Sequence, residues 1–340
     1  LTELVIARFI QGLGGALGLP VGRLIIIRTF GREKLIVTMN RVVIVGTLGP
    51  MLGPVIGGMI TTYFSWHWIF WVNLPVGFIA IGLAYHWLQA GESYSVPPLD
   101  KLGFILFSGA LAGFTFGLAA LSESIFNTSI ALSIIAFSLF LLMMYILHSR
   151  NRLHPIVKIE LLRLRTFRVA VMGNLLSRLG FGAMPFLVPL LLQLGLGFSA
   201  ELSGILLMPI ALGVLVGRPL FLRLLRILGY KRFLMGNTVF AGLIIWVFTS
   251  LNVDTPIYVI GFWTFLYGFI LTLQYSSMTS LAYAEILHEE FSAATSIMGT
   301  LQQFAQSFGV AVSALFLRFF SFIFSSPASS SGYAVLTPTV

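Results

Sequence analysis

Charged residues are scarce in this chain, and cysteine is absent. Of its 340 residues only 9% are Asp, Glu, Lys or Arg, whereas 58% are hydrophobic and the mean hydropathy is +0.98. A soluble domain of ordinary composition carries about 25% charged residues. The absence of cysteine excludes disulfides and thiolate metal sites. So little charge beside so much apolar surface predicts an integral membrane protein.

Long apolar runs separated by short polar segments dominate the sequence. A membrane-spanning helix needs about 20 mostly apolar residues, and about ten runs of that length are present. They are continuously apolar and do not alternate, which excludes a transmembrane barrel and predicts an all-α polytopic bundle. The expected spans are 4–27, 42–62, 69–88, 102–121, 130–148, 169–193, 202–222, 233–251, 257–283 and 292–320.

The basic residues are distributed on one side of these expected spans. If the chain crosses the membrane once per span, 16 of the 20 Lys and Arg fall on the same side, which the positive-inside rule makes cytoplasmic. This placement explains the net charge of +9 without a nucleic-acid partner. The cytoplasmic basic loops are 28–41, 149–168 and 223–232, together with Arg218 and with Lys101 in the loop 89–101.

Aromatic residues gather at one expected outer boundary. The loops 63–68, 122–129, 194–201 and 252–256 contain no Lys or Arg, as expected on the outer side. Trp and Tyr are enriched at membrane interfaces, where their amphipathic rings sit at the headgroup level. The residues expected to act as such anchors are Tyr63, Trp66, Trp68 and Trp71.

The second expected span is rich in glycine and proline. Glycines at every fourth position form one stripe, which allows close helix packing in lipid. Two prolines one turn apart remove backbone hydrogen bonds, so we expect a kinked, closely packed helix. The residues of this conformational motif are Gly49, Pro50, Gly53, Pro54, Gly57 and Gly58.

Two expected spans carry distinctive motifs: Leu4, Arg8 and Gln11 are followed by closely spaced glycines in the first, and the second contains the segment 49–58. The first motif resembles the fourth-helix motif of a known transporter family, the major facilitator superfamily, and the second resembles the fifth-helix motif of its antiporters. The segments 66–77 and 185–193 resemble one branch, the fourteen-helix drug:proton antiporters, or multidrug efflux permeases.

The resemblance implies a domain organisation and a missing part. Family helices one to three and fourteen, with the proton-carrying carboxylate in the first, are expected to lie outside this sequence. The implied divisions are 1–90 as the end of the N-terminal six-helix half, 91–150 as two linking transmembrane helices, 151–323 as the C-terminal half and 324–340 as a polar tail.

The resemblance also implies a function. It predicts a secondary active transporter of the bacterial inner membrane that exports small lipophilic or cationic compounds by proton antiport and alternating access. The expected partners are a small-molecule substrate and the lipid bilayer, with no nucleic acid and no cofactor beyond the proton gradient. Some members of the branch work with a periplasmic adaptor, but no docking surface for one is visible in this sequence.

Polar side chains inside the expected spans are candidates for a proton or substrate pathway. Charge at bilayer depth is costly, so Arg8 and Arg178 are expected to face the bundle or a cavity. The resemblance associates Arg8 with proton transfer. The alternative for every candidate is ordinary hydrogen bonding between helices. The pathway candidates are Arg8, Gln11, Asn174, Arg178, Gln193, Gln274, Gln302 and Gln306.

No enzymatic signature is present. The sequence has no His-Glu-x-x-His, Gly-x-Ser-x-Gly or Walker-type phosphate loop, so neither an enzyme nor a metal site is expected. The acidic residues all lie at span ends or in loops, so no proton-carrying acid is expected within these spans. Two alternatives remain open: a truncated, non-transporting membrane remnant, and a major facilitator transporter of another substrate.

Overall fold

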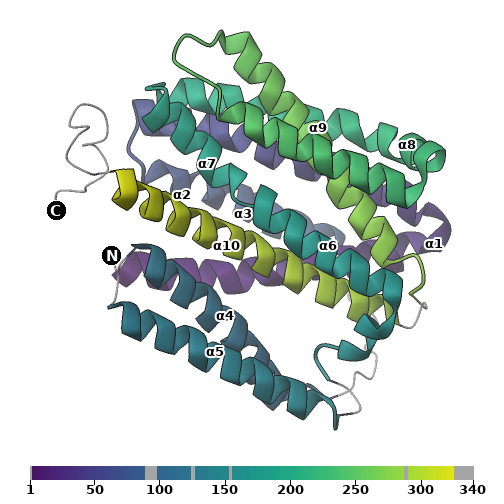
Figure 1. Ribbon diagram of the computed structural model, residues 1–340. Helices are drawn as coiled ribbons and strands as arrows, with labels where there is room; N and C mark the ends of the chain where they lie inside the picture. Colours follow the sequence, from purple (N-terminus) through teal and green to yellow (C-terminus); the bar gives the residue numbers. More distant parts are fainter. Residues whose placement is uncertain (1, 89–97, 124–126, 153–154, 287–289, 325–340) are drawn as a thin grey trace. The chain divides into compact units, whose positions relative to one another are not determined.

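The computed structural model describes residues 2–88, 98–123, 127–152, 155–286 and 290–324, and every regular element among them is helical. This confirms the all-α prediction. In chain order the helices are α1 (Thr2–Tyr63), α2 (Trp68–Trp71), α3 (Asn73–Trp87), α4 (Lys101–Glu123), α5 (Thr128–Ser149), a 3-10 turn (Ile159–Arg163), α6 (Arg165–Phe181), α7 (Met184–Leu190), a π turn (Leu191–Gly195), α8 (Ala200–Phe248), α9 (Ile257–Ala282) and α10 (Phe291–Phe324) (Figure 1).

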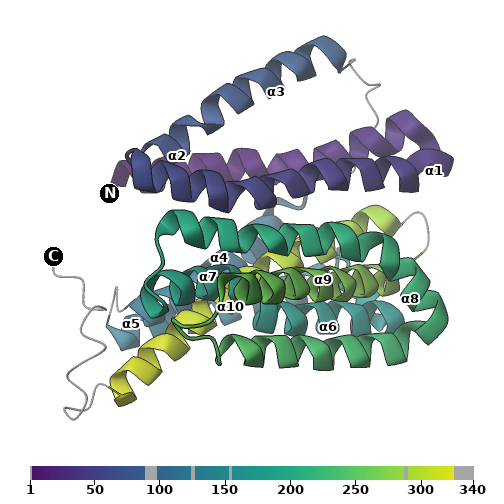
Figure 2. The same ribbon diagram turned by 90° about the horizontal axis from the view of Figure 1, so that it is seen from above.

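The helices have the length and composition of membrane spans. In the described part of the chain, seven helical segments are long and apolar enough to cross a membrane. One of them, α8, bends at Gly229, and each of its two arms is long enough to cross. Helix α1 has 62 residues, about 93 Å if straight, and Figure 2 shows that it folds back on itself. Each of these two helices therefore contains two of the predicted spans.

The bends of α1 and α8 lie at the same end of these helices in both views (Figures 1 and 2). Both belong to one compact unit, made of residues 1–74 and 198–273. The sequence around the α8 bend carries the predicted basic cluster 223–232, and α1 contains the basic stretch 28–41. The predicted cluster 223–232 therefore flanks the α8 bend at Gly229, and the one-sided charge distribution stays a prediction.

Packing divides the chain into two compact units that cut across chain order. The second unit consists of residues 75–197 and 274–340, so α9 contributes to both. The division into family halves at 1–90, 91–150 and 151–323 stays a prediction. Most of the predicted tail, 325–340, and the loop segment 89–97 lie outside the described residues.

Glycines set the closest helix crossing in the first unit. A Cβ atom on Gly268 of α9 would meet the backbone of Ile210 in α8, and a Cβ on Gly213 would meet the backbone of Phe265 and Phe269. Helices in lipid associate through such close packing because no hydrophobic effect drives them together. The α8–α9 pair therefore packs backbone against backbone.

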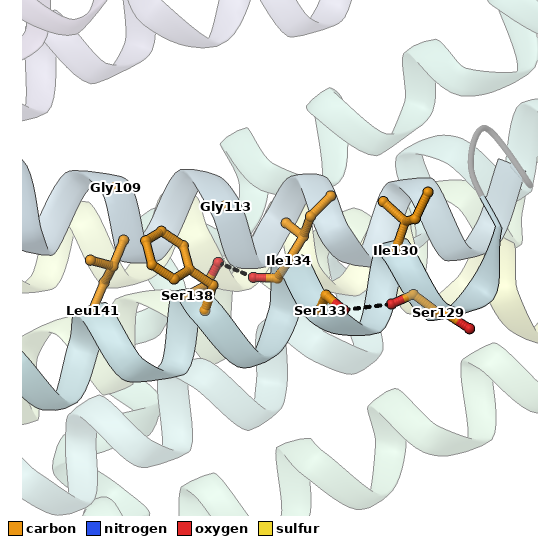
Figure 3. A pocket seen from close by; sticks show the side chains of 9 residues that line it. Gly109, Gly113, Ser129, Ile130, Ser133, Ile134, Ser138 and Leu141 are labelled. Atoms are coloured by element: carbon orange, nitrogen blue, oxygen red, sulfur yellow. Dashed lines mark hydrogen bonds between the residues drawn. The ribbon is translucent and has the colours of Figure 1, made fainter.

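The second unit contains a glycine-packed hairpin of α4 and α5. Gly109 and Gly117 of α4 lie against Leu141 and Ile135 of α5, and Gly113, between them, lies against Ser138. A shallow groove of about 630 Å³ runs along this pair (Figure 3). It is lined by Gly109, Gly113, Ser129, Ile130, Ser133, Ile134, Phe137, Ser138 and Leu141.

The groove is apolar in character. The hydroxyl of Ser133 donates to the carbonyl of Ser129, and that of Ser138 donates to the carbonyl of Ile134, both within α5 (Figure 3). Side-chain hydroxyls engaged by their own helix present little hydrogen-bonding capacity to a ligand. In a membrane, this surface suits lipid chains better than a polar substrate.

A carboxylate and an imidazole close one end of the α4–α5 hairpin. Asp100 accepts a hydrogen bond from the backbone N–H of Gly103, and Nε2 of His148 lies 2.9 Å from its Oδ1. The side chains of Asp100 and His148 are only 7% and 13% exposed. Nearby, the hydroxyl of Tyr145 accepts from the N–H of Val157 at 2.8 Å. These contacts tie the hairpin to the segment that follows it.

Asp100 makes the stability of this hairpin sensitive to acid. Burial raises the pKa of its carboxyl, but hydrogen bonds from Gly103 and His148 and the positive charge of Arg152 outweigh burial, so the pKa is lowered. Such a carboxyl stabilises the fold above its unfolded pKa of about 4 and loses that contribution as pH falls through the lower folded value.

We therefore expect Asp100→Asn to lower the unfolding temperature at pH 7, and the difference from wild type to shrink below about pH 4. Thermal unfolding of both purified proteins at pH 7 and pH 3 measures this. The same difference at both pH values would mean that the carboxylate charge contributes nothing.

The helix predicted over 169–193 is broken near Pro185, as expected. Helix α6 ends at Phe181, α7 starts at Met184 with Pro185 in its first turn, and a π turn follows. Proline lacks the N–H that would continue the helical ladder, so it begins a helix far more readily than it sits inside one. The predicted kink is confirmed.

Candidate functional site

A group of polar side chains surrounds Arg178 near the middle of the apolar segment 165–195. Nε of Arg178 donates to Oδ1 of Asn174 at 2.9 Å, and a terminal guanidinium nitrogen donates to Oε1 of Gln306 at 3.4 Å. The guanidinium carbon lies 4.1 Å from the ring centroid of Tyr275. Helices α6 and α10 and the second-unit part of α9 thus converge on one cation, and we call this group the Arg178 site.

Helix geometry and two glycines assemble the site. Asn174 and Arg178 are four residues apart on α6, so their side chains share one face, as predicted. A Cβ on Gly309 of α10 would meet the carbonyl of Arg178 at 2.8 Å, and a Cβ on Gly182 would lie 3.2 Å from Cα of Gln306. This backbone contact brings α10 close enough for Gln306 to reach the guanidinium.

A hydrogen bond also links α9 to α6, at the residue next to Arg178. Nε2 of Gln274 donates to the hydroxyl of Ser177 at 3.1 Å, and the Gln274 side chain is fully buried. Ser177 was not among the sequence candidates, although it lies three residues after Asn174 and next to Arg178. Its position on the predicted polar face is the signal that could have identified it.

The Arg178 site compensates a partly buried charge with neutral groups. A cation removed from water needs hydrogen bonds or a counter-charge, and a tyrosine ring face supplies only part of that stabilisation. Among the residues that the structure describes, the amide nitrogen Nδ2 of Asn174 is buried without a hydrogen-bond partner. The site therefore has an unused donor next to its cation.

Arg8 forms a smaller group in the first unit. A terminal nitrogen of Arg8 donates to Oε1 of Gln11 at 2.9 Å, and the guanidinium lies 4.6 Å from the ring centroid of Phe70. The shared face predicted for Arg8 and Gln11 is confirmed. Both side chains are exposed within the described structure, so the group is open and not enclosed by helices.

Two candidates are not brought into either group. Gln193 is exposed in the π turn, and Gln302 is partly buried one turn before Gln306 on α10. Within the described ranges, neither side chain has an assigned hydrogen bond. Their predicted role in a pathway stays a prediction.

The glycine- and proline-rich motif 49–58 contacts α8 at its C-terminal end. A Cβ on Gly58 would meet the carbonyl of Ala200 in α8, and a Cβ on Gly204 would meet the carbonyl of Pro54. Beyond this contact, the hydroxyl of Tyr63 donates to Oε2 of Glu201 at 2.9 Å. We call this set the α1–α8 contact.

The close packing predicted for the whole glycine stripe is wrong. A Cβ built on Gly49, Gly53 or Gly57 meets no described atom within 4 Å. The stripe lies on one face by spacing, but the neighbouring helix approaches a different face, which the spacing does not specify. The side chain of Pro50 lies outside the part of α1 whose side chains are described.

The predicted interfacial aromatics lie where α1 ends and α2 follows. Tyr63, Trp66, Trp68 and Trp71 are all exposed, as side chains that anchor a protein in the lipid headgroup region must be. Within the described ranges, no three His, Asp or Glu side chains gather closely enough to hold a metal ion.

Comparison with known proteins decides the family. Residues 1–310 match the Major Facilitator Superfamily. The chain belongs to this superfamily. It is therefore an integral membrane protein of a transporter family and not an enzyme, as predicted from its motifs and spans.

Named relatives in the superfamily cover nearly the whole chain. The chain is 36% identical to "Probable transport protein HsrA" of Haemophilus influenzae over 96% of its own length and 70% of that protein. It is 32% identical to "Putative multidrug resistance protein MdtD" of Escherichia coli over 94% of its own length and 68% of that protein. These likenesses agree with the drug:proton antiporter branch of the superfamily.

Proposed function

We propose that this major facilitator chain belongs to a bacterial inner-membrane exporter that moves small lipophilic compounds outward in exchange for protons. The observation that carries the proposal is the antiporter-like motif 49–58, whose last glycine lies in the α1–α8 contact. The names of the relatives, one a transport protein and one a multidrug resistance protein, support the same function. The proton gradient would supply the energy, and no cofactor is proposed.

The α1–α8 contact supports alternating access in particular. Small residues let α1 and α8 lie backbone against backbone, so few interlocked side chains oppose their separation. The Tyr63–Glu201 hydrogen bond joins exposed side chains at the same end of the pair. A helix pair held by such contacts can close one side of a transport pathway and open again.

The positive charge of the Arg178 site favours some classes of substrate over others. Its polar groups lie near the middle of a span, where major facilitator transporters bind their substrates between pseudo-symmetric halves. A fixed positive charge disfavours binding of a cationic group beside it. The proposal therefore keeps lipophilic compounds as the substrate class and gives less weight to the cationic compounds expected from the sequence.

Efflux from cells tests the proposal. Cells that express the full-length protein are expected to retain less of a fluorescent lipophilic compound than cells with an empty vector, and a protonophore is expected to abolish the difference. Three compounds of similar size, one neutral, one cationic and one anionic, would be compared. Unchanged retention of all three, or export that survives the protonophore, would contradict proton-driven export.

A further inference from the structure

We propose that the Arg178 site binds a carboxylate, or another oxyanion, on the transported compound. This inference rests on the proposed function, because it names the chemical class of the exported substrate. It starts from an imbalance of charge. The described partners of the Arg178 guanidinium are the amides of Asn174 and Gln306 and the ring of Tyr275, none of which carries a negative charge.

The three helices around the site carry no acidic residue. Helices α6, α9 and α10 contain neither Asp nor Glu along their whole length. These three helices therefore offer no carboxylate to Arg178. A cation in a low-dielectric site with only neutral partners attracts an anion strongly.

Asn174 supplies a directed donor to the same place. Its side chain is 2% exposed, and its Oδ1 accepts the Nε–H of Arg178. That bond fixes the orientation of the amide, because a guanidinium can only donate. The Nδ2 group therefore points away from Nε of Arg178, and it is buried without a described partner. A buried donor without an acceptor is unfavourable, so an incoming oxygen atom would stabilise it.

The guanidinium itself retains binding capacity. It has five N–H donors in a planar fork, and two of its nitrogens donate to Asn174 and Gln306. Fork geometry matches the two oxygens of a carboxylate. Tyr275 offers its ring to Arg178, so this aromatic face is already used and would not serve a cationic ligand.

A matched pair of probes tests the proposal on the purified full-length protein. We would measure the binding of 1-naphthoate and of its uncharged isostere 1-naphthamide by the rise in unfolding temperature with ligand concentration. We expect naphthoate to bind at least about tenfold more tightly than naphthamide, as a charge-assisted hydrogen bond would give.

Two substitutions separate binding from folding. Arg178→Gln removes the positive charge. Asn174→Asp keeps the side-chain shape and places a carboxylate 2.9 Å from Nε of Arg178, where its negative charge would pair with the guanidinium in place of a ligand. In both variants the preference for naphthoate is expected to disappear. Gln303→Ala, on the exposed face of α10, is the matched control and is expected to keep the preference.

Each outcome has one meaning. Equal binding of the two probes to wild type, no binding of naphthoate, or a preference that survives Asn174→Asp would overturn the anion site. This assay needs no proton gradient, so it stays informative if export fails. Conversely, protonophore-sensitive export of the neutral compound, with no naphthoate preference, would uphold the proposed function and reject the anion site.

Discussion

Gly58→Val is expected to lower the free energy of unfolding by at least about 1–3 kcal/mol, the usual penalty for overpacking. A Cβ at this position would meet the carbonyl oxygen and carbon of Ala200 and Cα of Glu201. These are backbone atoms, so no side-chain rotation can relieve the overlap. The α1–α8 contact would have to open, and both abundance in the membrane and transport should fall.

The neighbouring glycine provides the control. A Cβ on Gly57 meets no described atom within 4 Å, although the two glycines are adjacent in the same helix. Gly57→Val is therefore expected to change the unfolding temperature far less than Gly58→Val. Equal losses in both variants would show that valine harms this helix in general and that the contact with Ala200 is not specific.

Arg8→Ala is expected to reduce export to below about a tenth of the wild-type rate while abundance in the membrane stays similar. The side chain is exposed, donates to Gln11 and lies over the ring of Phe70, so its loss should cost little folding energy. A charge at bilayer depth is costly to retain, which indicates a role in transport and not in packing.

A second arginine serves as the comparison. Arg318 also donates a hydrogen bond, to the carbonyl of Leu121 at 2.6 Å, but it lies near the end of α10. Arg318→Ala is expected to leave the export rate nearly unchanged. If Arg8→Ala exports normally, or if its abundance falls together with its rate, Arg8 is a structural residue and the proton-transfer role should be abandoned.

The sequence predicted the helical segments well because length and hydropathy determine membrane spans. It did not predict that α8 would stay helical on both sides of its bend, because the basic residues there indicated a loop. Lys and Arg have high helix propensity, and only Gly229 interrupts the α8 helix. Residues that mark a turn between spans need not leave the helical conformation.

The candidate site was predictable along a helix but not between helices. The Asn174–Arg178 pair follows from its spacing of four residues on one helix. The contacts with Tyr275 and Gln306 depend on how α9 and α10 cross α6, which no local pattern specifies. The Asp100–His148 pair was missed because the two residues are far apart in the chain. An antiparallel hairpin places the start of one helix beside the end of the next, and that topology was the available signal.

The bend in α8 has a mechanical consequence. Gly229 alone has non-helical backbone angles within α8, with φ 68° and ψ 162°, a conformation that residues with a Cβ rarely adopt. A connection of one non-helical residue is too short to let the two spans that it joins move independently. One arm cannot slide along the membrane normal without pulling the other by the same amount. In a transport cycle the two arms of α8 would therefore travel as a pair, with Gly229 as a pivot and not as a spacer.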